Sequence, residues 1–490
     1  MAIELTIPNA ISRITNTLAQ ANFSAYLVGG CVRDLLMGKV PKDWDVATDA
    51  KPEQITSLFP KTFYENAYGT VTVVNDNETD ISLRNIEVTP FREEAKYSDK
   101  RHPDKVTFSK TIEEDIGRRD FTINALAYES SKRQIIDLYN GQADIKDKVV
   151  RAVGQADDRF DEDPLRIMRG VRLASELGFM INEETSQAIK ANAPLLQNIS
   201  KERIRDEFIK IIMSDRPMES IILSHELGIL KIIIPDLEST IGVEQNQAHS
   251  FDVWFHLLKS LNHAVKKKMS LDLRLAALFH DISKPETRRW SPEKKDWTFY
   301  GHDVVGAKRA AKILKDLRFP NELIEKVEKL VRWHMFFSDT EQITLSAVRR
   351  LIVNVGKENI WDLMNVRICD RIGTGRPKES PYRLRKYRSM IDEVLTDPIS
   401  VGMLKIDGSK VIRVTKMPPG PKIGHILHAL LEEVLEDPSL NTEEYLENKA
   451  VKLAELPENE LKAIGEKAKE KKESETEKKI TEIRDKHWVK

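Results

Sequence analysis

The sequence predicts an α+β protein, in which a mixed sheet with helices is followed by an all-helical remainder. Strand-like apolar runs (AYLVGG, GTVTVV, NIEVTPF and RQIIDLY) alternate with short helices and turn residues within the first 150 residues. From Pro164 onward, segments such as LRIMRGVRLASELGF and LRLAALFHDI repeat apolar residues at helical spacing. The length of 490 residues favours several domains, because one domain takes about 100 to 200 residues.

Breaks rich in proline and glycine near Pro235, Pro377 and Pro418 divide the chain. We expect an α/β head at 1–150, a helical neck at 151–235, a helical body at 236–376, a helical tail at 377–457 and a charged extension at 458–490. One face of a tail helix carries Ile423, Ile426, Leu427, Leu430, Leu431 and Val434. The Lys/Glu-rich extension is expected to be solvated or disordered.

Composition excludes several protein classes. The 77 Lys and Arg residues balance 78 Asp and Glu residues, so any polyanion partner needs a local basic groove. Only Cys31 and Cys369 are present, too few for a disulfide framework or a thiolate zinc site. No apolar run of about 18 residues and no signal sequence is found. We expect a cytoplasmic protein that does not contact a membrane, and the sequence leaves its oligomeric state open.

Candidate phosphate-binding and metal-binding residues are concentrated in LVGGCVRDLLMGKVPKDWDVATDA, residues 27–50. Gly29 and Gly30 separate an expected strand from an expected helix, so backbone N–H groups can approach a phosphate there. Arg33 follows in the first helical turns, within reach of phosphate oxygens. These three residues predict a phosphate-binding turn.

Asp43 and Asp45 predict a divalent-metal site. Residues two apart on a strand project to the same face, so both carboxylates would meet at one spot. Carboxylates together with substrate phosphates are typical Mg²⁺ ligands, and such ions activate a hydroxyl and stabilise leaving pyrophosphate. Glu87 in NIEVTPFR is the candidate third carboxylate, although Asp80 lies nearby and a surface position for Glu87 fits equally well.

The stretch LVGGCVRD…PKDWDVATDA resembles the signature of the class II tRNA nucleotidyltransferase and bacterial poly(A) polymerase family, within the polymerase-beta-like nucleotidyltransferase superfamily. The segment RRDFTINALAYE (118–129) resembles the second motif of that family. The resemblance implies that Arg119, Asp120 and Asn124 contact the incoming nucleotide and its ribose. The segment EDPLRIMRGVRLASELGF (162–179) resembles the base-selecting motif, and the likeness extends over roughly residues 20–450.

Base selection by Asp163 and Arg166 follows from what cytosine and adenine share. Both present an amino donor beside a ring-nitrogen acceptor, whereas uracil and guanine present a carbonyl beside an N–H. An Asp accepts and an Arg donates, and residues three apart on a helix are neighbours. The alternative is an intrahelical ion pair at a helix start. Arg169 and Arg172 are expected to continue the positive face toward the triphosphate or the RNA end.

A second metal site is predicted between residues 249 and 370. His256, the adjacent pair His280-Asp281, and Asp370 combine imidazoles with carboxylates, which suit divalent or transition metals that activate water. The pattern resembles the HD phosphohydrolase superfamily, which implies that these four residues are ligands. By the same resemblance, His302 and His334 would line the site. The domain would be either an active metal-dependent phosphohydrolase or a metal-binding or vestigial scaffold that holds tRNA.

Two further segments point to RNA. ERIRDEFIK, around Arg203, and YRLRKYR (382–388) carry basic residues at positions suited to phosphate contacts, and in YRLRKYR they alternate with aromatics. The charged segment 90–110 lacks helical periodicity and is expected to be a mobile loop. In the resembling family a loop at this place helps the change from C to A addition, so its presence favours A addition.

These expectations combine into a template-independent nucleotidyltransferase. It would add CCA, or the terminal A, to the 3′ end of tRNA from CTP and ATP with Mg²⁺, releasing pyrophosphate. Open alternatives are a poly(A) polymerase, against which the HD-like body argues, and a partial A-adding or CC-adding enzyme. From another class, an HD phosphohydrolase with an RNA-binding head also stays open.

Overall fold

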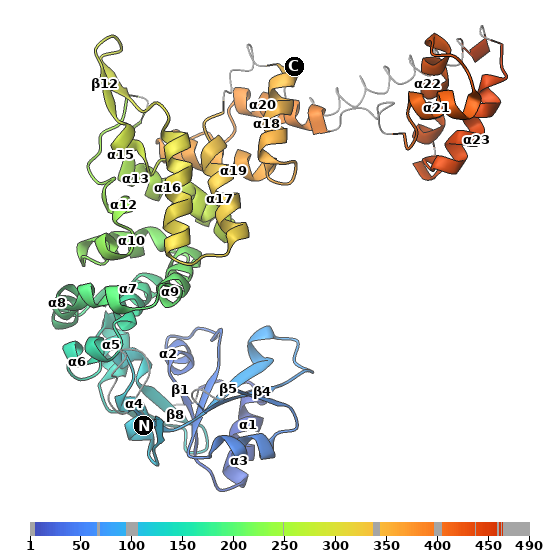
Figure 1. The fold of residues 1–490 in the computed structure, drawn as a ribbon. Helices are drawn as coiled ribbons and strands as arrows, with labels where there is room; N and C mark the ends of the chain where they lie inside the picture. The colour runs from blue at the N-terminus through green and yellow to red at the C-terminus, as the bar shows by residue number, and fades with distance from the viewer. Residues whose placement is uncertain are drawn as a thin grey trace. The chain divides into compact units, whose positions relative to one another are not determined.

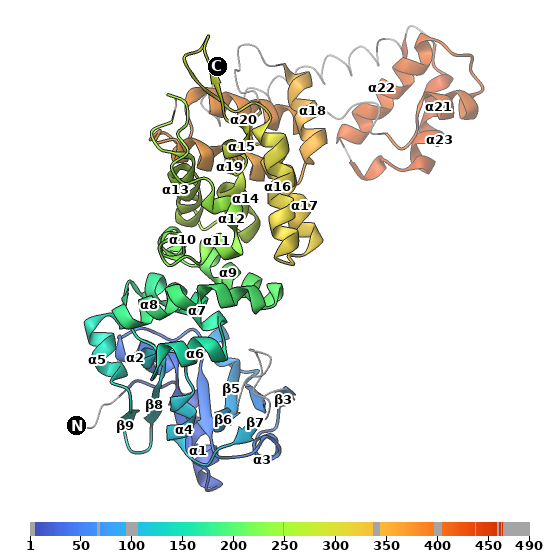
Figure 2. The ribbon, with the colours of Figure 1, turned by 60° about the vertical axis from the view of Figure 1, so that its left-hand side comes forward.

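The computed structural model describes residues 5–65, 69–94, 106–247, 249–336, 344–395, 404–436, 438–457, 460–461 and 463. The chain forms two compact units (Figures 1 and 2). The first comprises residues 1–332 and 369–376, and the second comprises residues 333–368 and 377–490. Both candidate sites described below lie in the first unit.

The head is built on a seven-stranded mixed sheet in the order β3-β4-β5-β2-β1-β8-β9. Only the central β2–β5 pair is parallel, and the other neighbours run antiparallel. The strands are β1 (Ala25–Val28), β2 (Asp45–Thr48), β3 (Thr62–Glu65), β4 (Thr70–Val74), β5 (Asn85–Pro90), β8 (Leu126–Glu129) and β9 (Gln134–Asp137). The prediction of a mixed sheet in the head is confirmed.

Side-chain alternation gives this sheet two buried faces. Leu27, Val46 and Leu126 pack into one apolar cluster, whereas the next residue of each strand, Val28, Ala47 and Ala127, packs into the other. Helices α1 (Asn9–Gln20) and α3 (Pro52–Leu58) contribute to the first cluster and α4 (Ile112–Gly117) to the second. The head also contains α2 (Gly30–Leu36), α5 (Gly141–Asp147) and the 3-10 turns η1 (Ile81–Leu83) and η2 (Thr122–Asn124). A small separate sheet pairs β6 (Arg92–Glu94) with β7 (Val106–Phe108).

Helices follow the head. They are α6 (Ala156–Glu162), α7 (Leu165–Leu177), α8 (Glu183–Asn192), α9 (Lys201–Met213), α10 (Pro217–Glu226), α11 (Leu230–Ile233) and α12 (Pro235–Glu238), with the 3-10 turn η3 (Ala193–Asn198). Helix α7 begins after Pro164 and ends at Gly178, whose φ of 69° is the left-handed conformation that glycine tolerates. Most of its residues are buried, and the less buried Arg169, Arg172 and Glu176 recur at helical spacing along one face.

The body of the first unit is helical as well. It contains α13 (Val253–Lys266), α14 (Leu271–Phe279), α15 (Lys284–Thr287), α16 (His302–Asp316), α17 (Asn321–Trp333) and the end of α19 (Ile360–Gly373). The prediction that the chain after residue 160 is mostly helical is confirmed, although two short strand pairs also form. β10 (Val149–Val150) pairs with β11 (Met180–Ile181), and β12 (Arg289–Ser291) pairs with β13 (Asp296–Thr298). Strands of two or three residues are too short to give an alternating pattern.

The second unit contains α18 (Leu345–Val355), α20 (Tyr382–Leu395), α21 (Gly408–Thr415), α22 (Pro421–Glu436), η5 (Pro438–Leu440) and α23 (Glu443–Ala454). The apolar face predicted from Ile423 to Val434 lies on α22 and is buried against α21 and α23. Residues 95–105 of the expected mobile loop lie outside the described residues. Most of the charged extension also lies outside them. Among the helices described, none is long and apolar enough to cross a bilayer.

Candidate active site and candidate metal centre

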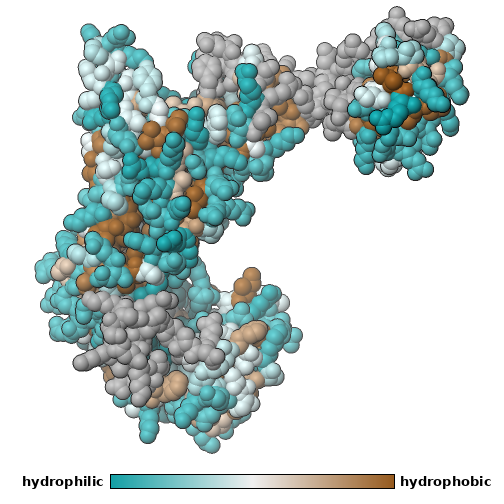
Figure 3. Space-filling model, in the orientation of Figure 1, coloured by the Kyte–Doolittle hydropathy of each residue, from teal (hydrophilic) through white to brown (hydrophobic). Residues whose placement is uncertain are grey.

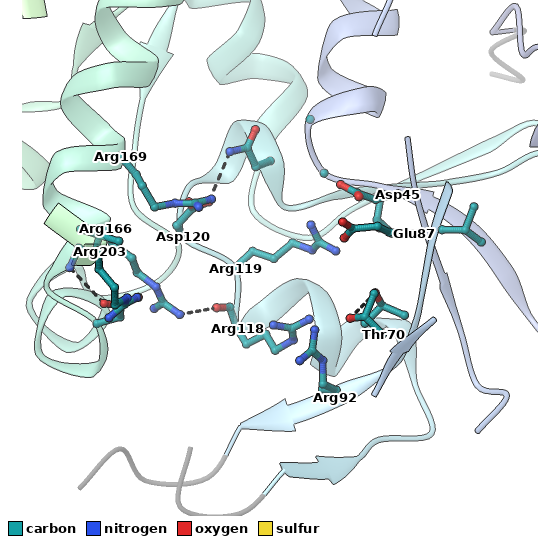
Figure 4. A pocket seen from close by; sticks show the side chains of 18 residues that line it. Asp45, Thr70, Glu87, Arg92, Arg118, Arg119, Asp120, Arg166, Arg169 and Arg203 are labelled. Carbon is teal, nitrogen blue, oxygen red and sulfur yellow. Dashed lines mark hydrogen bonds and ion pairs between the residues drawn. The ribbon is translucent and has the colours of Figure 1, made fainter. Parts of the chain in front are cut away.

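A pocket of about 480 Å³ opens at the end of the head sheet (Figure 4). Its lining joins strand ends, the loop before α7 and the first turns of α7 and α9. The residues are Val28, Gly29, Gly30, Asp45, Val46, Thr70, Glu87, Thr89, Arg92, Arg118, Arg119, Asp120, Asn124, Asp163, Leu165, Arg166, Arg169 and Arg203. Six arginines therefore face a cavity whose floor carries carboxylates, a charge pattern suited to a metal-bound polyphosphate.

Asp45 and Glu87 are direct neighbours across the only parallel strand pair of this sheet. Burial, opposed by Arg119 and reinforced by Glu87 and Asp43, raises the pKa of Asp45 to about 6. Carboxylates gathered in this way repel one another, and a hard divalent cation relieves that repulsion. The donor set therefore fits a divalent metal ion.

The strand argument for Asp43 was wrong, because β2 begins at Asp45. Asp43 lies in the bend before the strand and is exposed, and it is not among the residues that line the pocket. It still raises the pKa of Asp45 electrostatically, so the two carboxylates are near one another. Alternation along a strand is not what brings them together.

The turn after β1 brings the backbone close to Arg119. Gly29 has φ +76°, and a Cβ there would lie 2.7 Å from Arg119 Nη1 and 3.7 Å from Asp45 Oδ2. Only a glycine leaves space for the guanidinium, which Asp115 holds from the other side at 3.1 Å. Figure 4 shows the Arg119 guanidinium pointing toward Asp45 and Glu87.

Arg33 and Asn124 belong to a supporting hydrogen-bond chain. Arg33 Nη1 donates to Asn124 Oδ1 at 2.7 Å, and Asn124 Nδ2 lies 3.4 Å from Asp120 Oδ1. Asp120 also accepts from Arg169 at 2.7 Å. Burial alone would raise the pKa of Asp120, but Arg169 and Arg166 lower it to about 2. Arg33 is not among the lining residues, whereas Asn124, Asp120 and Arg169 are.

Asp163 and Arg166 both line the pocket, each held by a neighbour. Asp163 precedes Pro164 and α7, and its Oδ2 accepts from Arg203 of α9 at 2.7 Å. Arg166 donates to Glu162 at 2.7 Å and to the Arg118 carbonyl at 3.0 Å. Asp163 and Arg166 therefore do not form the ion pair considered as an alternative, because Asp163 pairs with Arg203 and Arg166 pairs with Glu162.

Arg172 lies farther along α7 and is not among the lining residues. Its Nε donates to Glu207 of α9 at 2.5 Å and its Nη1 to Glu176 at 2.9 Å. Glu207 is only 2% exposed, so this ion pair connects α7 to α9. Arg172 therefore contributes to the packing of these helices.

Sequence reasoning missed several lining residues. Arg118 stands beside Arg119 in RRDFT, and Arg92 follows the strand run NIEVTPF, so both were visible as motif neighbours. Thr70 and Thr89, whose hydroxyls are 3.2 Å apart, carry no local signal. Arg203 was singled out only as an RNA contact, since its approach to Asp163 depends on how α9 packs.

Four side chains of the body converge in a second cluster. His256 of α13, His280 and Asp281 after α14, and Asp370 of α19 are buried and offer ligand atoms that all lie within 4.8 Å of one another. His280 Nδ1 donates to the Ala277 carbonyl at 2.9 Å, which turns its Nε2 toward His256 Nε2, 2.8 Å away. Two imidazoles and two carboxylates aimed at one point fit a divalent or transition metal.

The surroundings of this cluster are strongly charged. Asp281 and Asp370 overcome burial and raise the pKa of His280 to about 10, whereas burial lowers the pKa of His256. His302 Nε2 lies 3.2 Å from Asp281 Oδ1, beside the site as predicted. His334 belongs to the second unit.

Two neighbours of the cluster were not predicted. Lys284 is 4% exposed, and its Nζ lies 2.6 Å from Asp281 Oδ2. The His249 ring packs edge-on against His256, with centroids 5.3 Å apart. Burial, together with Lys284 and His256, lowers the pKa of His249 to about 3. Lys284 was visible in the sequence, in HDISKP, three residues after the candidate ligand Asp281.

Sequence models of three families match the chain. The Poly A polymerase head domain matches residues 25–151, the probable RNA and SrmB-binding site of polymerase A matches 178–241, and the HD domain matches 248–372. The residues lining the pocket lie within the first match, in the segment that follows it and, for Arg203, within the second match. The candidate metal cluster lies within the third.

Full-length relatives cover nearly the whole chain. The CCA-adding enzyme of Lactobacillus helveticus is 34% identical over 444 residues, 89% of this chain and 96% of the relative. The CC-adding tRNA nucleotidyltransferase of Thermus thermophilus is 32% identical over 428 residues, 84% of this chain and 90% of the relative.

Solved structures agree in fold. The CCA-adding enzyme of Bacillus stearothermophilus in complex with CTP aligns with a TM-score of 0.58 and 28% identity, covering 91% of this chain and 98% of that one. The Thermotoga maritima enzyme complexed with tRNA_CCA aligns with a TM-score of 0.52 at 19% identity, covering 92% and 97%, which supports the fold alone. By its family matches and full-length relatives, the chain belongs to the class II tRNA nucleotidyltransferase family, which includes the CCA-adding enzymes.

Proposed function

We propose that this protein adds C, C and A to the 3′ end of tRNA without a nucleic-acid template, using CTP, ATP and Mg²⁺ and releasing pyrophosphate. The observation that carries the proposal is the pocket that joins Asp45 and Glu87 to Asp163 and Arg166. One end offers carboxylates to a metal, and the other offers an acceptor and a donor to a base. Full-length relatives named for CCA addition support the same activity.

Different residues of the pocket would bind the metal, the triphosphate and the ribose. Asp45, Asp43 and Glu87 would hold Mg²⁺, which when bound activates the 3′ hydroxyl and stabilises the departing pyrophosphate. Arg119, beside Asp45, and Arg118 would bind triphosphate oxygens at the Gly29–Gly30 turn. Asn124 and Asp120 would meet the ribose, with Arg33 orienting Asn124 through the 2.7 Å hydrogen bond.

Base selection would use the acceptor–donor pair before α7. Asp163 would accept the amino group of cytosine or adenine, and Arg166 would donate to the neighbouring ring nitrogen. Arg203 and Glu162 hold these two side chains at 2.7 Å each. Such support limits how far either side chain moves, which is what rejection of uracil and guanine requires.

The metal role is tested by nucleotide incorporation. Asp43→Ala is expected to abolish transfer of labelled nucleotide to tRNA lacking CCA, while tRNA affinity measured by filter binding stays within about twofold. Asp80→Ala, which changes an exposed carboxylate at the N-terminus of η1, is the matched control and should retain transfer. Retained transfer by the Asp43 variant would refute its metal role.

The HD cluster supports a second activity, metal-dependent phosphoester hydrolysis. The supporting observation is the convergence of His256, His280, Asp281 and Asp370 within 4.8 Å. A divalent metal such as Mn²⁺ is expected to raise the melting temperature of the wild type and to permit hydrolysis of a general phosphoester substrate such as p-nitrophenyl phosphate. Asp370→Asn should lose both effects and keep nucleotide addition. A metal-induced stabilisation without hydrolysis would identify a metal-binding scaffold.

The proposal also concerns the location and partners of the protein. tRNA, CTP and ATP would be its ligands, and the cytoplasm its compartment. Cys31 and Cys369 are both buried thiols, which is compatible with a reducing environment.

A further inference from the structure

The β12–β13 hairpin is an aromatic and basic element within the body. Trp290 and Trp297 are direct cross-strand partners, and their rings lie 5.2 Å apart at 76°. The Arg288 guanidinium stacks over Trp297 at 3.6 Å. A two-stranded hairpin is marginally stable by itself, so this stack explains why the hairpin forms.

Two aromatic side chains of this segment are largely exposed to solvent. Trp290 is 54% exposed and Tyr300, just after β13, is 76% exposed. Exposed cations surround them, since Arg289, Lys294 and Lys295 all lie on the surface. Lys294 Nζ stands 5.3 Å from the Tyr300 ring centroid. Packing within the hairpin uses one face of Trp290, but it leaves much of the Trp290 and Tyr300 side chains accessible to solvent.

Both ends of the hairpin are tied to the metal cluster. Before β12, Lys284 contacts Asp281 at 2.6 Å. After β13, the Phe299 carbonyl accepts from His302 Nδ1, and His302 Nε2 is 3.2 Å from Asp281. The loop before α13 is joined as well, because Gln247 N donates to Asp296 Oδ2 at 3.1 Å. The residues that flank the hairpin therefore attach it to the candidate metal cluster of the body.

We propose that the β12–β13 hairpin is an RNA-binding element that stacks an unpaired base of the RNA on Trp290 and holds the flanking phosphates with Arg289, Lys294 and Lys295. This inference rests on the proposed function, in which RNA is the substrate. Aromatic faces among cations are the features that bind unpaired RNA, because every base has a stacking face and every nucleotide a negative charge.

The surface chemistry favours RNA over a protein partner. The segment from Arg288 to Tyr300 contains four basic and two acidic residues. One of the acidic residues, Asp296, accepts a hydrogen bond from the Gln247 backbone N–H. Figure 3 shows the hairpin surface in white and teal, with the brown apolar residues lower, over the helices. A protein-docking patch would offer a contiguous apolar area, which this hairpin lacks on the face shown.

The test measures the affinity of the full-length chain for tRNA lacking CCA, by fluorescence anisotropy at several salt concentrations. Trp290→Ala is expected to weaken binding about tenfold, the size of one lost base stack, whereas Trp290→Phe stays within about twofold. Lys294→Ala/Lys295→Ala should weaken binding and make it less dependent on salt. The matched control, Lys308→Ala/Lys315→Ala, removes two exposed lysines of α16 and should bind like the wild type.

Nucleotide addition at saturating tRNA is measured on the same proteins, and their melting temperatures confirm folding. Loss of affinity with an unchanged maximal rate supports the hairpin as an RNA contact. Unchanged tRNA affinity in folded Trp290→Ala overturns the proposal and leaves the patch to a protein ligand. If the wild type adds no nucleotide but Trp290→Ala still weakens RNA binding, the proposed function fails while this inference stands.

Discussion

At the scale of one residue, the charged form of Asp45 is disfavoured by burial and by neighbouring carboxylates and favoured by Arg119. Its carboxylate faces Glu87 across the strand pair and sits in a site that disfavours its charge, so its pKa is raised to about 6. A raised pKa means that folding favours the protonated form, and the stability this provides at low pH is lost as pH rises to about 6. In the absence of metal, the charged site therefore destabilises the fold at neutral pH.

Asp45→Asn is expected to raise the free energy of unfolding at pH 7.5 by up to about 3 kcal/mol, because one pKa unit corresponds to about 1.4 kcal/mol. The gain should shrink at pH 4.5, where the wild-type carboxyl is largely protonated. Urea unfolding in EDTA at the two pH values measures it. Equal gains at both pH values would contradict the assignment of the effect to ionisation.

Asp163 carries the proposed choice of base. Asp163→Asn presents an amide that can donate to the uracil carbonyl, so the ratio of kcat/KM for CTP to that for UTP should fall about tenfold or more, since a bidentate base contact is worth about 1–3 kcal/mol. Asp158→Asn, an exposed residue of α6, is the control with the same chemical change. An unaltered ratio would remove Asp163 from base selection.

At the scale of elements, the β1–α2 turn decides whether Arg119 reaches the carboxylates. Gly29→Ala adds a Cβ 2.7 Å from Arg119 Nη1 at a φ of +76°, so we expect nucleotide addition to fall at least about a hundredfold. Gly38→Ala is the matched control, because Gly38 also has a positive φ, +69°, but no atom lies within 4 Å of its Cβ. Steady-state incorporation compares them, and equal activities would mean that the close approach does not matter.

The junction of α7 and α9 depends on an ion pair with one fully buried partner. Arg172→Met leaves the buried Glu207 carboxylate with the more distant Lys210, 3.6 Å away, and should cost about 2–4 kcal/mol of unfolding free energy. Arg172→Met/Glu207→Met should recover most of that loss, because no unpaired charge remains. Chemical denaturation measures both, and a single variant as stable as the wild type would show that the pair does not hold the helices.

Elements whose own residues show apolar periodicity or a motif were predictable from the sequence, and features that depend on distant contacts were not. β1, β5 and α22 follow from apolar periodicity, and the head motifs are enough to identify most of the pocket. The position of Asp43 outside β2 was not predictable, because strand ends carry no periodic signal. Arg203 and Arg172 show the same limit, since their partners Asp163 and Glu207 lie 40 and 35 positions away in sequence and meet only after α9 packs.

At the scale of the whole molecule, two candidate centres for phosphate chemistry lie on one chain. The head pocket gathers arginines around carboxylates, and the body cluster gathers imidazoles and carboxylates without any residue in common. Substitutions in the two centres are therefore expected to act independently. The relatives named for CCA addition and for CC addition alone make the extent of addition the central question.

The most direct measurement resolves, on a sequencing gel, the products formed with Mg²⁺ on tRNA transcripts that end at the discriminator base, at C, or at CC. Each is supplied with CTP, ATP, both, or UTP and GTP. The account predicts completion of CCA from every starting end, followed by a stop, and no incorporation of U or G. Long A tails, a stop after CC, or addition of A alone would each identify a different enzyme, and no addition to any end would contradict the account.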